Sequence, residues 1–341
     1  MKHGRWLKPL SSAAAIVMAF LIAGFVVFLS GEDPGTAYRA LFRGAFGSLT
    51  GLKNTVRYSI PIIMLGFSFA ICNDCGFFNI GQEGQMYAAA IAAAGAALIG
   101  AGLPRGLQLL LIIAAAVIAG GILCLIPAVL KFVFGVNEVI VSMLLNYILV
   151  LLTNYLLLNS SIGITGRTTP SSIEFEPRIE AWVLAGLSAL IMLAYALFMK
   201  NTVPGYRLRM TGRNADFAKA NGIRVRKIIL SACFLGGAFS ALSAVGEILG
   251  IYHRVYDGFA ENLGFYGMTA ALIGSQSTSG LIFGGIILGA LQSGSVSLTV
   301  MTDVSSDMVL VVQGFVMLFA TVNILRILGK RGKHYGLSST S

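Results

Sequence analysis

Two short polar segments carry most of the side chains in this sequence that can bind a solute. The first runs from Asn79 to Gln85 as Asn-Ile-Gly-Gln-Glu-Gly-Gln, between two long apolar stretches. The second, from Asn262 to Gly267, reads Asn-Leu-Gly-Phe-Tyr-Gly and shares the pattern Asn-[Ile/Leu]-Gly-x-x-Gly. Polar, glycine-broken backbone at membrane depth is tolerated only where it lines a cavity or packs against protein. Both segments are therefore candidate parts of a solute pathway.

The chemistry that these segments offer is reversible hydrogen bonding. Amide groups hold a solute weakly enough to release it, which suits a pore wall better than dense charge does. The alternative is hydrogen bonding between helices inside the bundle, which contributes about 0.6 kcal/mol per bond on average. The candidate wall residues are Asn79, Gln82, Glu83, Gln85, Asn146, Asn262 and Tyr266.

A second pair of matches supports an internal duplication. Ala-Ala-Leu-Ile-Gly occurs at residues 96–100 and again at 270–274, and Gly-Leu follows at 106–107 and at 280–281. Glycine-interrupted apolar segments at corresponding positions of two halves point to the binding site of a transporter. The alternative is chance, because membrane helices favour small residues for close packing. Duplication is the preferred interpretation.

Composition identifies a polytopic membrane protein. Of the 341 residues, 56% are hydrophobic and only 11% are charged, whereas soluble domains carry about 25% charged residues. The net charge of +10 does not indicate nucleic-acid binding, because 16 of the 24 Lys and Arg residues fall in the segments predicted to be cytoplasmic or at the cytoplasmic ends of the adjoining spans. That asymmetry follows the positive-inside rule and so reports topology.

The predicted fold is an all-α integral membrane protein of about ten transmembrane helices, in two inverted repeats with broken helices. Repeat one covers residues 55–158 and repeat two covers 228–327, after a first helix at 10–29, and the whole chain, 1–341, forms one permease domain. Ten spans place both termini in the cytoplasm, and equivalent helices then enter from opposite sides. The spans are predicted at 10–29, 55–72, 85–101, 107–134, 140–158, 181–199, 228–251, 262–274, 281–300 and 308–327.

Residues 200–227 form the only long cytoplasmic loop, with eight basic residues against the single acid Asp216. A short helix is predicted within it. Asn214 can cap the start of this helix, Asp216 suits the positive end of its dipole, and Gly222 can end it in the left-handed conformation. Such a helix can dock into a partner protein. The alternative is a solvated basic loop that only sets topology.

Nothing in the sequence indicates an enzyme, a cofactor or a metal site. The three histidines have no metal-ligand spacing, and no phosphate-binding loop of the G-x-x-x-x-G-K-[S/T] type occurs. Cys72 and Cys75 have the spacing of a redox pair but not its surroundings, so all four cysteines are interpreted as small buried hydrophobic residues. A secondary transporter driven by Na⁺ or H⁺ fits the repeats equally well, but it gives the cytoplasmic helix no role.

Three motifs in order resemble the permease subunits of bacterial ABC importers. They are residues 79–85, residues 137–140 with 145–148, and the segment from Gly212 to Ile223. The particular relatives are the nucleoside and simple-sugar uptake systems that work with binding proteins of the basic-membrane-lipoprotein type. The broader group includes ribose and branched-chain amino-acid permeases.

This resemblance implies the translocation subunit of an ATP-driven importer in the bacterial inner membrane, for nucleosides or alternatively for ribose-like sugars. The implied partners are an ATPase with two nucleotide-binding modules that carries the ATP and Mg²⁺, a second homologous permease and an extracytoplasmic binding lipoprotein. The resemblance also makes the loop helix a coupling helix seated in the ATPase. The coupling residues are then Arg209, Gly212, Arg213, Asn214, Phe217, Ala218 and Gly222.

Overall fold

A computed structural model describes residues 33–164, 169–176, 178–274 and 277–301. It also describes residues 18, 21, 22, 24, 25, 27–29, 31, 311, 314, 315 and 318. Most of the predicted first span, 10–29, and of the predicted last span, 308–327, lies outside these residues, as does the basic C-terminal tail. The number of ten spans therefore stays a prediction, and so does the inverted repeat.

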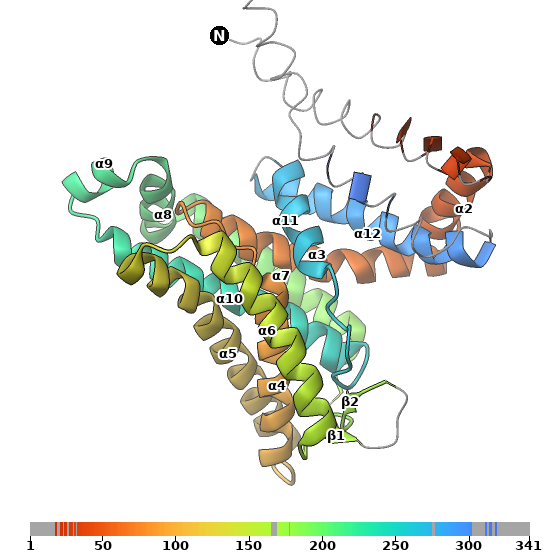
Figure 1. The fold of residues 1–341 in the computed structure, drawn as a ribbon, viewed down its shortest axis with the longest axis horizontal. Coiled ribbons are helices and arrows are strands. Elements are labelled where there is room, and N and C mark those ends of the chain that lie inside the picture. The colour runs from red at the N-terminus through yellow and green to blue at the C-terminus, as the bar shows by residue number, and fades with distance from the viewer. Residues whose placement is uncertain are drawn as a thin grey trace, which may run out of the picture. The chain divides into compact units, whose positions relative to one another are not determined.

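The described residues are mostly helical (Figure 1). The helices are α2 (Pro34–Phe46), α3 (Leu49–Asn73), α4 (Gln82–Ile99), α5 (Arg105–Phe134), α6 (Glu138–Asn159), α7 (Ala181–Asn201), α8 (Val203–Arg213), α9 (Ala215–Ala220), α10 (Val225–Gly250), α11 (Leu263–Ile273) and α12 (Thr278–Met301). Two-residue strands, β1 (Gly163–Ile164) and β2 (Ser171–Ser172), pair antiparallel in the segment predicted as a polar external loop. The all-α prediction missed this pairing, which gives partners to loop backbone groups that no helix satisfies.

Six of these helices are long and apolar enough to cross a membrane: α3, α5, α6, α7, α10 and α12. The described part of the chain is thus that of a multi-pass membrane protein. The helix α4 is not among the six because its first turn is polar, and α11 is too short. Both helices begin inside the two broken segments, α4 at Gln82 and α11 at Leu263.

The start of the second predicted span was wrong by six residues. The helix α3 begins at Leu49 and not at Thr55. Its first two turns contain Lys53 and Asn54, and a hydropathy pattern does not detect a helix that continues beyond the apolar region. The segment before α3 forms a further helix, α2, which Asp33 caps by accepting hydrogen bonds from the backbone of Gly35 and Thr36.

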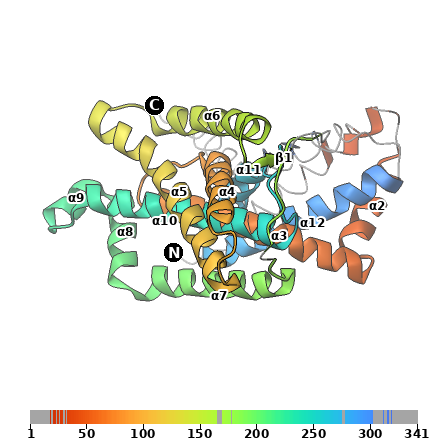
Figure 2. The ribbon, with the colours of Figure 1, turned by 90° about the horizontal axis from the view of Figure 1, so that it is seen from below.

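The contacts of the chain divide into two units. The larger unit contains residues 60–271 and 276–285, and its centre is the packing of α10 against α5 and α4 (Figures 1 and 2). Gly237 on α10 lies so close to Gly120 on α5 that neither position has room for a side chain. Small residues at a crossing let two helix backbones approach closely. The alanine-rich face of α4 completes this core.

The smaller unit contains residues 1–59, 272–275 and 286–341. Within it α2 packs on α12, because Gly44 and Gly294 leave no space for side chains at the contact. The hydroxyl of Ser293 lies 3.4 Å from the carbonyl oxygen of Gly44 and 3.3 Å from that of Gly51, and it donates to them. All residues discussed below belong to the larger unit.

Candidate functional site

The first broken segment is held by amide side chains. Asn79 is fully buried, and its Oδ1 accepts hydrogen bonds from the backbone N–H of Gly81 and from Nε2 of Gln85, both at 3.0 Å. Asn146 on α6 accepts from the backbone N–H of Gly84 at 2.8 Å and donates to the carbonyl oxygen of Ile80 at 3.0 Å. These bonds satisfy backbone groups that the break and the first turn of α4 leave without helical partners.

The same network continues into the neighbouring helices. The hydroxyl of Ser240 on α10 donates to Oε1 of Gln85 at 2.9 Å, and it lies 2.9 Å from the hydroxyl of Ser68 on α3. Gln82 donates to the carbonyl oxygen of Leu65 at 2.7 Å. Asn79, Gln82 and Gln85 are each at most 1% exposed, so they do not face open space. Their placement matches the alternative of hydrogen bonding inside the bundle.

The second broken segment meets the first one. A side-chain carbon on Gly264 would lie 3.0 Å from the backbone nitrogen of Glu83, so the two segments are in contact at that point. Burial raises the pKa of the Glu83 carboxyl to about 7, and the backbone of Asn262 opposes this shift. Asn262 itself has a φ of 61°, the left-handed region that asparagine tolerates better than most residues. Two segments selected from the sequence by one shared pattern are therefore neighbours.

A cavity of about 520 Å³ lies beside this meeting point. Its walls come from α4, α6, α11 and the segment between α10 and α11. Three aromatic rings and three carboxylates face it, and no Lys or Arg is among its described lining residues. The lining residues are Glu83, Tyr87, Met143, Asn146, Tyr147, Val150, Asp257, Gly258, Glu261, Asn262 and Phe265.

The cavity contains some of the predicted wall residues and not others. Glu83, Asn146 and Asn262 line it, whereas Asn79, Gln82, Gln85 and Tyr266 do not. Sequence reasoning missed the aromatic rings and the carboxylates of the segment after α10. One local signal was available, because Tyr87 follows Glu83 by four residues and so lies on the same face of a helix. Asp257 and Glu261 stood in a segment interpreted only as a polar loop.

The carboxylates of this cavity retain oxygen atoms that can accept further hydrogen bonds. Asp257 accepts one bond from the side chain of Asn154 through Oδ2, at 3.1 Å. Glu83 and Asp257 are half-buried, and Glu261 is exposed. A solute that donates hydrogen bonds and stacks on a ring would satisfy both features of this lining.

The short helix predicted in the cytoplasmic loop is present as α9, directly after α8. The Oδ1 atom of Asn214 accepts a hydrogen bond from the backbone N–H of Phe217 at 2.9 Å, and Gly222 has a φ of 75°. The predicted cap and the predicted end are both confirmed. Arg213, Asn214 and Phe217 are exposed and Ala218 is fully buried, so α9 presents an aromatic ring and polar groups to solvent.

The helix α8 packs against the turn that precedes the first broken segment. Gly212 lies against the carbonyl oxygen of Asp74 with no room for a side chain, and its Cα lies 3.6 Å from the position of a side-chain carbon on Gly76. Burial raises the pKa of the Asp74 carboxyl to about 6, although the charges of Arg209 and Arg213 oppose this shift. The helix α8 therefore contacts the backbone five residues before Asn79.

A second cavity, of about 540 Å³, lies at this junction. Asp74, Lys200 and Arg209 supply its charged groups, and the first residues of α12 form another wall. The predicted coupling residues therefore divide between two positions. Arg209 and Gly212 face the turn after α3. Arg213, Asn214, Phe217 and Gly222 form the exposed tip, and Ala218 is buried beneath it.

The sequence is similar to known permeases over almost its entire length. Residues 51–321 match the model of the family described as the permease component of the branched-chain amino acid transport system. The guanosine ABC transporter permease protein NupP of Bacillus subtilis is 31% identical over 94% of this chain and 95% of its own. The nucleoside ABC transporter permease protein NupB of Lactococcus lactis is 27% identical over 93% of this chain and 92% of its own.

A relative with a different solute in its name is almost as similar. The glucose ABC transporter permease protein TsgB13 of Haloferax volcanii is 29% identical over 92% of this chain and 87% of its own. The family match covers well over half of the chain, and the polar break, the cavity and the cytoplasmic helices lie inside the matched range. This multi-pass membrane protein therefore belongs to the permease family of the branched-chain amino acid transport system.

Proposed function

We propose that this chain is the translocation subunit of an ATP-driven importer of nucleosides. The observation that carries the proposal is the cavity beside the two broken segments, whose lining combines aromatic rings with carboxylates. Two relatives aligned over more than nine-tenths of the chain are named for guanosine and for nucleosides. A nucleoside joins a flat base to a sugar with hydroxyl groups, and such a lining can bind both parts.

The base and the sugar have different partners in this proposal. Tyr147 and Phe265 offer ring faces to a base, and base–aromatic stacking contributes about 1–3 kcal/mol per base. Glu83 and Asp257 accept hydrogen bonds from the sugar hydroxyls, and because burial raises the pKa of Glu83 to about 7, its acceptor strength increases with pH. The lack of Lys and Arg among the described lining residues suits a solute without phosphate.

A simple sugar is the alternative solute, favoured by the similarity to the glucose permease of Haloferax volcanii. Carboxylates and amides would bind a sugar as well as they bind a ribose. Aromatic rings also pack against sugars, so the lining alone separates the two classes weakly. Two of these three relatives, including the one with the highest identity at 31%, are named for guanosine or nucleosides, which favours nucleosides.

The proposed topology places the cavity on the outer side and the α8–α9 segment on the cytoplasmic side of a bacterial inner membrane. The charge rule puts residues 200–227 inside and residues 253–261 outside. Two contacts within the larger unit agree with this assignment, whereas Glu83, in the loop 73–84 predicted to be inside, touches Gly264 near the outer segment. Gly212 touches Asp74, and both are predicted to be inside, whereas Ser171 pairs with Tyr256, and both are predicted to be outside.

The proposed motor is a separate ATPase with two nucleotide-binding modules, which carries the ATP and Mg²⁺. Its seat is the exposed tip formed by Arg213, Asn214 and Phe217. Because Gly212 lies against Asp74, a push on this tip reaches the turn before Asn79, and the amide network then connects it to α4. A second permease and an extracytoplasmic binding lipoprotein complete the proposed assembly.

The experiment is uptake of a labelled nucleoside by vesicles that contain the whole importer. We expect uptake that requires ATP, that unlabelled nucleoside competes away and that an ionophore does not affect. Replacing Arg213 and Asn214 by glutamate should release the ATPase and abolish uptake while the permease remains inserted. Arg178→Glu, in the segment predicted to be outside, is the matched charge-reversal control.

Three results would contradict parts of the proposal. Uptake by the permease alone from an ion gradient would identify a secondary transporter. ATP-driven uptake of glucose or ribose without nucleoside uptake would identify the sugar alternative. Normal uptake with full ATPase retention in the Arg213→Glu, Asn214→Glu variant would remove the coupling role from α9.

A further inference from the structure

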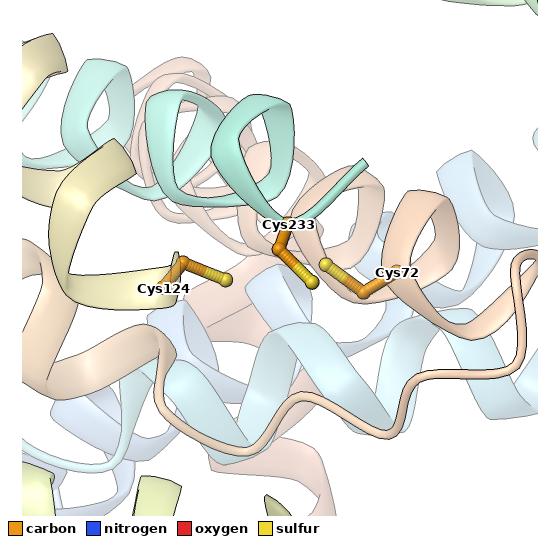
Figure 3. A group of neighbouring side chains, drawn as sticks. All are labelled: Cys72, Cys124 and Cys233. Atoms are coloured by element: carbon orange, nitrogen blue, oxygen red, sulfur yellow. The ribbon is translucent and has the colours of Figure 1, made fainter. Parts of the chain in front are cut away.

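Three of the four cysteines are far apart in the sequence and meet at one point in the bundle. Cys72 lies on α3, Cys124 on α5 and Cys233 on α10, and all three are fully buried. Their sulfur atoms lie within 4.8 Å of one another, and none forms a disulfide. Figure 3 shows the three side chains pointing from their helices toward a common centre.

This arrangement has the dimensions of a three-coordinate sulfur site. At the corners of an equilateral triangle with an edge of 4.8 Å, each sulfur would be 4.8/√3, or about 2.8 Å, from the centre. Bonds from zinc to a cysteine sulfur are about 2.3 Å long. A shift of about half an ångström at each side chain therefore closes the site around an ion, which is within the range of a side-chain rotation.

The donor set selects the kind of ion. Thiolates bind soft metal ions, and hard cations such as Mg²⁺ or Ca²⁺ require oxygen ligands. No His, Asp or Glu completes the group among the described residues. An ion that is stable with two or three sulfur ligands therefore fits better than one that requires four.

Burial limits the charge that the site can hold. A net charge in an apolar interior is costly, so a neutral complex is strongly favoured. A divalent ion bound by two thiolates and one neutral thiol is neutral, and its binding releases two protons. Cys72 is suited to remain the thiol, because its sulfur lies 3.7 Å from the carbonyl oxygen of Ala232, to which it donates. Cys124 and Cys233 then supply the thiolates.

We propose that Cys72, Cys124 and Cys233 form a binding site for one soft divalent cation of low coordination number, such as Hg²⁺. Because each helix supplies one ligand, the bound ion links α3, α5 and α10. Its binding stabilises the folded chain, because the unfolded chain lacks the assembled site.

The test uses the full-length chain, purified with its thiols reduced and incubated with one equivalent of Hg²⁺. After excess glutathione has removed weakly held metal, we expect about one mercury per chain, a sulfur-to-metal charge-transfer absorption and a higher melting temperature. Cys124→Ala and Cys233→Ala should each weaken binding at least tenfold. Cys75→Ala is the matched control, because this fourth cysteine is buried nearby but lies outside the cluster.

Each of the other outcomes overturns the proposal. Less than a tenth of an equivalent retained by the reduced wild type would show that the cluster does not bind the ion. Equal retention by the wild type and by Cys124→Ala would place the ion elsewhere. Loss of the ion in Cys75→Ala would indicate a chelate of Cys72 and Cys75. Where an alanine variant fails to fold, Cys124→Ser tests the same ligand. Uptake is not used, so failure here leaves the proposed function intact.

Discussion

The two broken segments share one sequence pattern and differ in what surrounds them. In the first segment Asn79 is fully buried and bonded to Gly81 and Gln85. In the second segment Asn262 is half-buried, takes a left-handed conformation and lines the larger unit's aromatic cavity. The difference shows that a polar break is tolerated in two ways. Either protein groups satisfy its backbone, or it borders a space that a solute can enter.

Replacing Asn79 by alanine should have the largest effect on stability. The change leaves the backbone N–H of Gly81 and the amide of Gln85 without their acceptor in a buried place. At about 1–3 kcal/mol for each unsatisfied group, the free energy of unfolding should fall by about 2–6 kcal/mol. The melting temperature of the purified chain measures this change.

The control is the same substitution in the second segment. Asn262→Ala changes the ease of a left-handed conformation, and since both residues have a side-chain carbon the loss should be smaller than the roughly 1–2 kcal/mol that this conformation costs an ordinary L-residue. A loss at Asn262 equal to or greater than that at Asn79 would mean that the two breaks are held alike, and the comparison would fail.

The sequence predicted what local chemistry determines. The apolar runs gave most helices to within a few residues, and the cap at Asn214 and the turn at Gly222 follow from the preferences of those residues. It did not predict which groups satisfy the first break. Asn146 reaches Ile80 from 66 residues away, and this requires knowledge of which helices pack together.

The same reason explains the other omissions. The three clustered cysteines come from helices separated by dozens of residues, so no spacing rule detects them. Asp257 and Glu261 became cavity residues only because their segment folds over α4 and α6. The hydropathy pattern did not indicate the start of α3 at Leu49, because the first turns of this helix are polar. Hydropathy marks the apolar part of a helix and not its full length.

Tyr147→Ala should have the next largest effect, this time on uptake. Its ring faces the cavity, and loss of one base-stacking contact should raise the KM for nucleoside on the order of tenfold. Tyr155 on the same helix is similarly exposed, at 61% against 66%, but does not line the cavity. Tyr155→Ala should therefore change the KM less than twofold. Equal changes in KM at both positions would show that the base does not stack on Tyr147.

Asp74→Asn should have the smallest effect, and that effect should depend on pH. Because burial raises the pKa of this carboxyl from 3.8 to about 6, its charged form destabilises the fold. Wild-type stability should therefore decline as the pH rises from about 4 through 6, and Asp74→Asn should escape this decline. Melting temperatures between pH 4 and pH 8 measure it, with the exposed Asp216→Asn as control. A variant that melts lower than wild type at pH 7.5 would show that Arg209 and Arg213 outweigh burial.

The most direct measurement of the account is protection of a cavity residue by solute. All four native cysteines are buried, so a cysteine introduced at Met143, which lines the cavity, reacts selectively with a membrane-impermeant maleimide. Arg178→Cys, an exposed position away from the cavity, is the reference. In the assembled importer, saturating nucleoside should slow labelling at position 143 and leave position 178 unchanged. Unchanged labelling at position 143 while the complex transports nucleoside would show that the solute passes elsewhere.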